Sequence, residues 1–286
     1  MLVPNYTSAP KNALFAYAVD IESLIEQGNA AYDEGRSEEA IQYFDQALAI
    51  DPENVTALVS KGLALDDLDR SEEAIQYYDR ALAIDPSDTD ALDSKGLALY
   101  NLDRSDEAIQ LFDRALAIDP SDTDALDNKG LALDDLDRSE EAIQYYDRAL
   151  AIDPSDTDAL DSKGLALYNL GRIDEAIQLF DKVLAMDAND SDALNNKGLA
   201  FVKLGRTDEA IQLFDKVLAM DANDSDSLVN KGLAIYNLGR TDEAVKYYDR
   251  ALAIDPSDVD AQSNKDNALL SLSSLAKRNQ NTSAIS

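Results

Sequence analysis

Apolar residues recur at helical spacing in residues 89–122, in two stripes separated by the short polar stretch Arg104–Asp106. Spacings of three and four residues place side chains on one face of a helix, so each stripe predicts one amphipathic α-helix. Pro120 stops the second helix, and the Ser and Asp that follow it can cap the next one. The stripes consist of Ala91, Leu92, Gly96, Ala98, Leu99 and Leu102, and then of Ala108, Ile109, Phe112, Ala115 and Leu116.

The same pattern returns every 34 residues. The tetrapeptide Glu-Ala-Ile-Gln first occurs at Glu39 and recurs at this step as far as Glu209, and Glu243-Ala-Val-Lys completes the series. Residues 61–102 and 129–170 are identical, which indicates that a block of two repeats was copied whole. A fixed period of this length is typical of tandem helical hairpins. The seven repeats are 21–54, 55–88, 89–122, 123–156, 157–190, 191–224 and 225–258.

These residues resemble the tetratricopeptide repeat. When each repeat is counted from position 1, that family has a small residue at position 8, Ala at 20, an aromatic residue at 24 and Pro at 32. The resemblance covers about five-sixths of the chain and implies an all-α fold, a right-handed α-solenoid (superhelix) of tandem hairpins. The matching residues are Gly28, Gly62, Gly96, Gly130, Gly164, Gly198 and Gly232 at position 8; Ala40 to Ala244 at position 20; Phe44, Tyr78, Phe112, Tyr146, Phe180, Phe214 and Tyr248 at position 24; and Pro52, Pro86, Pro120, Pro154 and Pro256 at position 32.

The turn between the two helices of a repeat contains Gly or Asp at position 15. Both residues tolerate the left-handed backbone that helix ends often adopt, although Asp does so less easily. We therefore expect a left-handed residue at this position in every repeat. The residues are Gly35, Gly171, Gly205 and Gly239, and Asp69, Asp103 and Asp137.

The segments outside the repeats do not follow the pattern. In residues 1–20 we expect an N-terminal extension with a short capping helix around residues 14–18, preceded by a mobile segment, Met1–Pro10. Residues 259–278 begin like another first helix but have Asp266 where Gly belongs, and no second helix follows. We interpret this segment as a terminal solvating helix and residues 279–286 as a flexible tail.

The charge of the chain excludes several classes of partner. Asp and Glu number 57 against 25 Lys and Arg, so the formal net charge is −32. A protein that binds nucleic-acid phosphates or an anionic membrane needs a basic face, so we expect neither partner. Position 7 is Lys in repeats 2 to 7, and we interpret these residues as structural cations in an acidic stack. They are Lys61, Lys95, Lys129, Lys163, Lys197 and Lys231.

The chain contains no Cys and no His. These absences remove thiolate chemistry, the usual general base and the commonest zinc ligand, so we expect no enzyme activity, no cofactor and no metal. Asp88–Asp93 and Asp187–Asp192 look superficially like calcium loops, but they lack the Gly and the Glu that such loops require. A catalytic carboxylate pair is also disfavoured, because it needs one differentiated environment and these carboxylates repeat.

The sequence favours a soluble, cytoplasmic protein. The beginning of the chain, Met1–Asn5, lacks the cationic region of a secretory signal. No apolar run approaches the roughly 18 residues that a membrane-spanning helix needs.

The candidate binding surface is the face of each first helix that lies opposite its apolar stripe. Positions 2, 5, 6, 9, 12 and 13 fall on this face at about 100° per residue, and in the tetratricopeptide family it lines the concave groove that contacts ligands. The resemblance therefore implies a protein-binding site, with no catalytic, cofactor-binding or metal-binding residues. Its residues are Asp90, Asp93, Leu97, Tyr100, Asp124, Asp127, Asn128, Leu131, Asp134, Asp158, Asp161, Leu165, Tyr168, Asn196, Leu199, Asn230, Leu233 and Tyr236.

A strip of Leu and Tyr edged by carboxylates suits a protein or peptide segment that carries Lys or Arg and apolar anchors. The family's clamp for acidic chaperone C-termini is disfavoured, because positions 2 and 5 here hold Asp. The asparagines at position 6 weakly resemble the ladder by which some long arrays hold a peptide backbone. Taken singly, these residues also fit structural roles: carboxylates in a first turn favour the helix dipole, and Leu and Tyr can pack on neighbouring helices.

A second hypothesis gives the acidity another origin. The chain could be a self-assembling or spacer solenoid whose charge is a solubility adaptation to high salt, with no specific groove ligand. Self-association is compatible with either hypothesis. The sequence identifies a scaffold and does not name its partner.

Overall fold

The structure, a computed structural model, describes the backbone of residues 11–283 and the side chains of residues 21–274. This part of the chain forms helices joined by short turns and contains no strand. Nowhere in it is a helix both long enough and apolar enough to cross a membrane. The helices are α1 (Lys11–Asp33), α2 (Ser37–Ile50), α3 (Val55–Asp66), α4 (Ser71–Ile84), α5 (Thr89–Tyr100), α6 (Ser105–Ile118), α7 (Thr123–Asp135), α8 (Ser139–Ile152), α9 (Thr157–Asn169), α10 (Ile173–Met186), α11 (Ser191–Lys203), α12 (Thr207–Met220), α13 (Ser225–Asn237), α14 (Thr241–Ile254) and α15 (Val259–Ser283).

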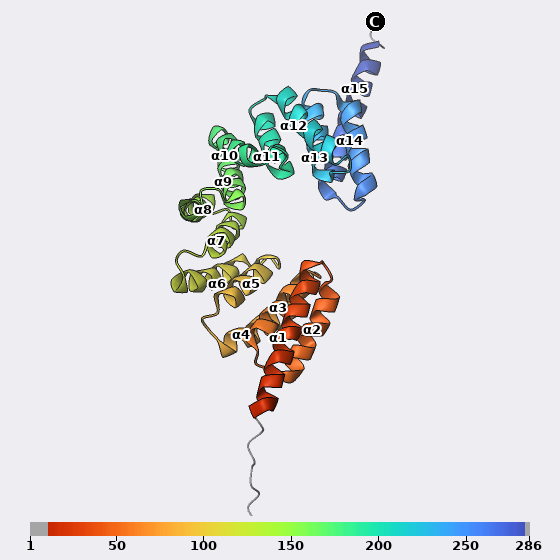
Figure 1. Ribbon diagram of the computed structural model, residues 1–286. Helices are drawn as coiled ribbons and strands as arrows, with labels where there is room; N and C mark the ends of the chain where they lie inside the picture. The colour runs from red at the N-terminus through yellow and green to blue at the C-terminus, as the bar shows by residue number, and fades with distance from the viewer. Residues whose placement is uncertain (1–10, 284–286) are drawn as a thin grey trace, which may run out of the picture. The chain divides into compact units, whose positions relative to one another are not determined.

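The helices fall into two compact units. The N-terminal unit, residues 1–153, contains α1 to α8, and the C-terminal unit, residues 154–286, contains α9 to α15. Within each unit every helix packs on the next one, and each odd-numbered helix also contacts the next odd-numbered helix (Figure 1). Each odd-numbered helix up to α13 forms a hairpin with the even-numbered helix that follows it. This arrangement confirms the predicted all-α solenoid of tandem hairpins.

The first helix of most hairpins starts at a side-chain cap. Asp88 accepts a hydrogen bond from the backbone N–H of Ala91 at 2.7 Å, and Asp122 does the same for Ala125 at 3.1 Å. Such caps satisfy a backbone donor that the first helical turn leaves unpaired. Two repeats have Ala instead of Pro after the second helix, at Ala188 and Ala222, yet α10 and α12 end at the same repeat position as the other second helices.

The turn between the helices of a hairpin adopts the predicted left-handed conformation. The four glycines at position 15 have φ between 70° and 76°, and Asp69, Asp103 and Asp137 have φ of 57°, 58° and 57°. An L-residue with a side chain is strained there, because its Cβ crowds the following carbonyl oxygen. Aspartate therefore adopts the same turn as glycine, at a cost.

Each hairpin is closed by a contact between a glycine and an aromatic ring. The glycine at position 8 faces the ring at position 24, and a Cβ added to any of the seven glycines would lie 2.3–2.5 Å from the nearest ring carbon. Both Tyr78 and Phe112 are fully buried. The absence of a side chain thus lets the two helices approach until the ring fills the space between them.

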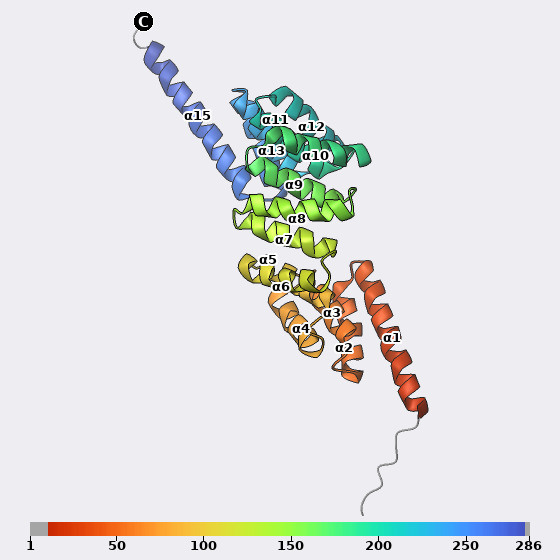
Figure 2. The ribbon, with the colours of Figure 1, turned by 90° about the vertical axis from the view of Figure 1, so that its left-hand side faces the viewer.

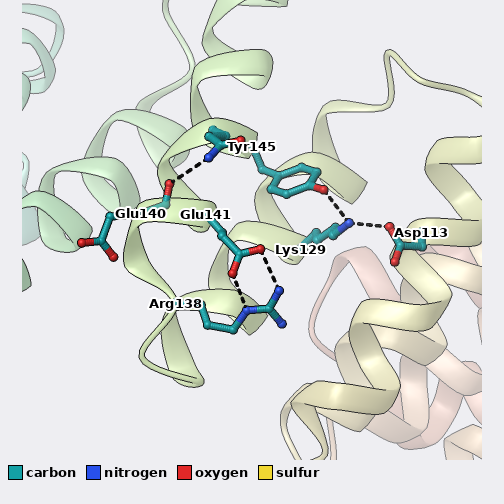
Figure 3. Close-up of polar contacts among 7 residues, drawn as sticks. Asp113, Lys129, Arg138, Glu140, Glu141 and Tyr145 are labelled. Carbon is teal, nitrogen blue, oxygen red and sulfur yellow. Dashed lines mark hydrogen bonds and ion pairs between the residues drawn. The ribbon is translucent and has the colours of Figure 1, made fainter.

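Ion pairs join consecutive hairpins on the side of the even-numbered helices. The ammonium of Lys129 pairs with the carboxylate of Asp113 in the preceding hairpin and donates a hydrogen bond of 2.7 Å to the Tyr145 hydroxyl (Figure 3). The equivalent pair of Lys95 and Asp79 is 2.5 Å apart. These lysines therefore have the structural role that the sequence predicts. The same pairing occurs at Lys61–Asp45, Lys197–Asp181, Lys231–Asp215 and Lys265–Asp249.

Both terminal helices are longer than predicted. The short separate helix expected around residues 14–18 is part of α1, which runs unbroken from Lys11 to Asp33. Helix α15 continues to Ser283, so residues 279–283 are helical and not a tail. No proline or glycine occurs near residue 20 or near residue 278, where the helices are predicted to end. The predicted mobile segment, Met1–Pro10, and residues 284–286 lie outside the described residues.

We predict that Gly96→Ala destabilises the N-terminal unit by about 1–3 kcal/mol, because the new methyl group overlaps the ring of Phe112. Helix propensity alone would favour alanine by about 1 kcal/mol, so the two effects have opposite signs. The urea midpoint of unfolding measures the change. In the Phe112→Leu background the same substitution should cost much less; an equal cost in both backgrounds would contradict the proposed overlap.

We predict that Asp103→Gly stabilises the N-terminal unit by up to about 1 kcal/mol, because glycine adopts positive φ without the Cβ penalty. The chain offers a matched reverse change, Gly171→Asp, which should destabilise the C-terminal unit by a similar amount. Thermal melting of both variants checks the prediction. Opposite shifts support it, and a lower melting temperature for Asp103→Gly would refute it.

Candidate functional site

One hollow on the odd-numbered helices of each unit is built from the same repeat positions. In each unit the cavity is lined by positions 2, 5, 6 and 9 of successive first helices and by the aspartate that caps the next one. The N-terminal groove has a volume of about 400 Å³ and is lined by Thr56, Val59, Ser60, Leu63, Asp88, Asp90, Asp93, Ser94, Asp122 and Asp124. The C-terminal groove has a volume of about 490 Å³ and is lined by Asp161, Leu165, Asp192, Asn195, Asn196, Leu199, Asp226, Val229, Asn230, Asp258 and Asp260.

Each groove combines apolar side chains with a surrounding set of carboxylates. Leu63 and Leu165 remain 36% and 37% exposed although their neighbours on the helix are buried. In the C-terminal groove, five aspartates accompany Leu165, Leu199 and Val229. A surface of this kind can accept apolar side chains and attract cations at the same time.

The aspartates at position 5 are partly buried between neighbouring first helices. One carboxylate oxygen of Asp93 and one of Asp161 are buried without a hydrogen-bond partner in the described part of the chain. The pKa of Asp93 is raised to about 8, first by burial and then by the charge of Asp122 and a hydrogen bond with it. Asp93 is therefore largely protonated near neutral pH and contributes little charge to the N-terminal groove.

The carboxylate of Asp161 is also buried, but it accepts a hydrogen bond from a side-chain amide. Its pKa is raised to about 6, first by burial and then by Asp190, while a hydrogen bond from Asn196 opposes the rise. The amide nitrogen of Asn196 lies 3.1 Å from the carboxylate. At neutral pH Asp161 is therefore mostly ionised, and the C-terminal groove keeps more of its negative charge.

The amides of the C-terminal groove also connect its helices. Asn195 accepts a hydrogen bond from the Ser227 hydroxyl at 2.7 Å, which links α11 to α13, while the bond from Asn196 to Asp161 links α11 to α9. Both amides thus have structural partners. Asn230, on α13, lines the same groove.

The structure brings together some of the predicted site residues and separates others. Asp90, Asp93 and Asp124 line the N-terminal groove, and Asp161, Leu165, Asn196, Leu199 and Asn230 line the C-terminal groove. The others lie on the same helices outside these two cavities: Leu97, Tyr100, Asp127, Asn128, Leu131, Asp134, Asp158, Tyr168, Leu233 and Tyr236.

Two of these outlying residues lie near the ends of the first helices. The carboxylate of Asp134 accepts a hydrogen bond from the Ser139 hydroxyl, so it helps to join the two helices of its own hairpin. Burial raises the pKa of Tyr100, and the carboxylates of Asp135 and Asp134 add to this rise. Position 12 is therefore close to the acidic end of the next first helix.

Sequence reasoning missed the capping aspartates. Asp88, Asp122 and Asp258 line the grooves in addition to starting helices. Their place directly before position 1, only two residues from the groove residue at position 2, is the signal that could have identified them as groove residues.

A third cavity, of about 390 Å³, lies on α10, α11 and α12 and contains Phe201. Its cations are paired, Lys197 with Asp181 at 2.5 Å and Arg206 with Glu209 at 2.7 Å. Among the described residues, no group of three or more carboxylates is arranged to hold a metal ion. The two acidic grooves are therefore the stronger candidates for a binding site.

Comparison with known proteins agrees with the hairpin architecture. A family model described as tetratricopeptide repeat matches residues 25–89, 94–157, 162–226 and 196–259. No curated protein sequence matches the chain.

Three solved structures illustrate the similarity. A tetratricopeptide repeat protein from Parabacteroides merdae is 18% identical, with a TM-score of 0.73 over 87% of this chain and 99% of its own. A chain of the APC/C hetero-tetramer Cut9–Hcn1 is 19% identical, with a TM-score of 0.73 over 85% of this chain and 48% of its own, so the chain spans about half of that protein's length. YrrB, described as a repeat protein with an unusual peptide-binding site, is 26% identical, with a TM-score of 0.50 over 65% of this chain and 95% of its own.

We predict that the N-terminal unit loses stability as pH rises through about 8. The folded-state pKa of Asp93, about 8, exceeds the unfolded value of roughly 3.9. The folded state therefore binds more protons, and the resulting stabilisation, complete at low pH, disappears as the pH passes the folded pKa. Urea midpoints measured between about pH 5 and about pH 9 should fall, and Asp93→Asn should reduce the fall.

Asp106→Asn, an exposed change on α6, is the control for this series and should leave the pH dependence of the midpoint unchanged. A fall of the same size in wild type and Asp93→Asn would refute the role of Asp93.

Proposed function

Because the chain belongs to the tetratricopeptide repeat family, we propose that it is a non-enzymatic scaffold that holds a basic, amphipathic protein segment in its acidic grooves. Proteins of this family are generally scaffolds for protein–protein interaction. The observation that carries the proposal is that both units build a groove from the same positions, with leucine or valine among carboxylates. The peptide-binding site described for the similar protein YrrB supports a peptide or protein as the ligand class.

The C-terminal groove is the stronger of the two candidates. It has the larger volume and the larger apolar lining, with Leu165, Leu199 and Val229. Its carboxylates also repel one another: burial raises the pKa of Asp226, and the charges of Asp224 and Asp258 raise it further. A Lys or Arg side chain placed among these groups would relieve the repulsion, so a cationic ligand gains more here than at an isolated aspartate.

Apolar contacts would supply the remaining affinity. Partly exposed leucines recur at position 9 of the first helices, as at Leu63, Leu97 and Leu165, and apolar side chains that gather on one surface often mark an interaction site. In this proposal the leucines receive apolar side chains of the ligand, while the carboxylates around them select and orient its cations. The carboxylates at position 2 lie in first helical turns, where they also favour the helix dipole, so they have a structural role as well.

A matched pair of variants tests the proposal. The groove variant changes Asp192, Asp226 and Asp260 to Asn, and the control changes Asp174, Asp208 and Asp242 to Asn. Both sets consist of exposed aspartates in the first turns of helices, so both remove the same charge and the same dipole interaction. Only the first set lines or borders the C-terminal groove.

We predict that the groove variant weakens binding of a fluorescent helical peptide of leucines and lysines by about tenfold, or about 1.4 kcal/mol. The control should change it by less than about threefold, because it lowers only the overall charge. Fluorescence anisotropy at physiological salt measures both dissociation constants. Equal weakening in the two variants would indicate diffuse attraction and contradict a groove site; it would favour the alternative of an acidic spacer without a specific ligand.

A further inference from the structure

The acidic residues are confined to the central part of the sequence. All Asp and Glu residues lie between Asp20 and Asp266, while residues 1–19 and 267–286 contain none. The second of these segments contains Lys277 and Arg278 together with several leucines. The chain itself therefore contains a segment of the chemistry that its grooves favour.

This segment is the second half of α15. Helix α15 has 25 residues, whereas the other odd-numbered helices of the C-terminal unit have 13. Its first half packs on α13 and α14, where Ala261 and Ala268 are completely buried and Lys265 pairs with Asp249 at 2.7 Å. In both views the remainder of α15 extends away from α13 and α14 (Figure 2). The projecting part, residues 269–283, forms about 22 Å of helix at 1.5 Å per residue.

The projecting half begins with uncovered leucines. Leu269 is 44% exposed and Leu270 is 67% exposed. Lys277 follows Leu270 by seven residues, a spacing that places both positions on one face of an α-helix. The spacing therefore assigns one apolar and one cationic position to the same helix face.

No second helix of the usual kind can cover these leucines. Position 8 of this last helix is Asp266 and not glycine, so an aromatic ring could not approach the backbone there as closely as it does in every hairpin. Position 4 is Gln262, where all the repeats have Leu. The sequence of α15 therefore ends the stack while leaving an apolar face exposed.

We propose that residues 269–283 of α15 dock in the C-terminal groove of a second copy of this chain. The groove supplies Leu165, Leu199 and Val229 for the leucines of α15 and a set of five aspartates for its cations. The helix cannot reach the groove of its own unit, because Asp258 and Asp260 at its N-terminal end line that groove and the helix then continues away from it without a break. This inference rests on the proposed function, since it names the ligand of the same groove.

The arrangement allows a closed dimer. Groove and ligand both belong to the C-terminal unit, so a two-fold axis can place each α15 in the groove of the other copy, which satisfies both sites at once. Two such contacts reinforce each other, because the second forms within an already associated pair.

The test measures the mass of the full chain by sedimentation equilibrium over a concentration series at physiological salt. The wild type should show a monomer–dimer equilibrium. The variant Leu270→Glu, Lys277→Glu, Arg278→Glu should raise the dimer dissociation constant at least tenfold, because it removes an anchor and reverses two charges. Lys246→Glu and Leu204→Glu, exposed changes on α14 and just after α11, are matched controls that should leave it unchanged.

Charge exchange identifies the groove as the partner surface. Asp192→Lys with Asp226→Lys should weaken the dimer as the α15 variant does, and combining these changes with Lys277→Glu and Arg278→Glu should restore a dissociation constant within a few fold of the wild type. Far-UV circular dichroism checks that each variant is folded.

Several results would overturn the inference. A chain that stays monomeric throughout the concentration series would overturn it. A dimer whose dissociation constant is unchanged in the α15 variant would also overturn it. So would a dimer that the α15 variant weakens but that neither the two groove substitutions nor the combined charge exchange affects. The proposed function fails separately, if the leucine–lysine peptide binds the groove variant of Asp192, Asp226 and Asp260 as tightly as its control. A monomeric chain that still binds this peptide in the groove would therefore reject self-recognition and retain the scaffold.

Discussion

The close contact between the position 8 glycine and the position 24 ring is the constraint on which the remaining structure depends. It recurs in all seven hairpins with nearly the same geometry, and it fixes how closely the two helices approach. Because the fold is quasi-one-dimensional, a local spacing that is constant in each hairpin is transmitted to every junction within a unit. The lysine at position 7 lies beside this glycine in the sequence, and its ammonium pairs with an aspartate of the preceding hairpin at Lys61, Lys95, Lys129, Lys197 and Lys231. Packing within a hairpin and attraction between hairpins are thus set by two adjacent residues.

The grooves follow from this packing, and they have an energetic cost. Positions 2, 5, 6 and 9 of the stacked first helices lie along one surface. A charged residue that recurs at one of these positions is therefore close to the same charge on the neighbouring first helix. Position 5 is the most confined of them, as the raised pKa values of Asp93, about 8, and Asp161, about 6, indicate. Hydrophobic or amide residues at this position, such as Val59 and Asn195, would avoid the cost, and the chain uses them in other repeats. Retaining aspartate there is a destabilising choice that a binding role would explain, since a cationic ligand offsets the repulsion.

Much of the fold could be predicted from the sequence, but the depth to which neighbouring helices bury the groove residues could not. The period of 34, the helix pairs, the left-handed turn at position 15 and the outward face of each first helix follow from local chemistry and periodicity. Periodicity assigns a residue to a face, but it does not say how deeply the next helix covers that face. Asp161 and Asn196 were therefore expected as open groove residues, whereas they form a hydrogen bond of 3.1 Å between helices. Likewise, Asp134 serves the start of its own second helix through Ser139. The ends of α1 and α15 were misjudged because loss of the repeat pattern was interpreted as loss of helix, although no helix-breaking residue occurs there.

A nearly perfect repeat raises the question of how one groove can differ from another. Residues 61–102 and 129–170 are identical, so surfaces built entirely within these blocks offer a ligand the same side chains twice. Both acidic grooves draw on residues outside the copied blocks: Thr56, Val59 and Ser60 in one, and α11 and α13 in the other. In each, a neutral residue at position 5 lies beside an aspartate at position 5 of an adjacent hairpin, Val59 next to Asp93 and Asn195 next to Asp161. Val59 replaces the carboxylate with an apolar side chain and Asn195 replaces it with an amide, so each removes one negative charge beside the remaining aspartate. Under the proposed function, specificity would reside where the repeat is broken, and the unbroken repeats would hold those places at a fixed spacing.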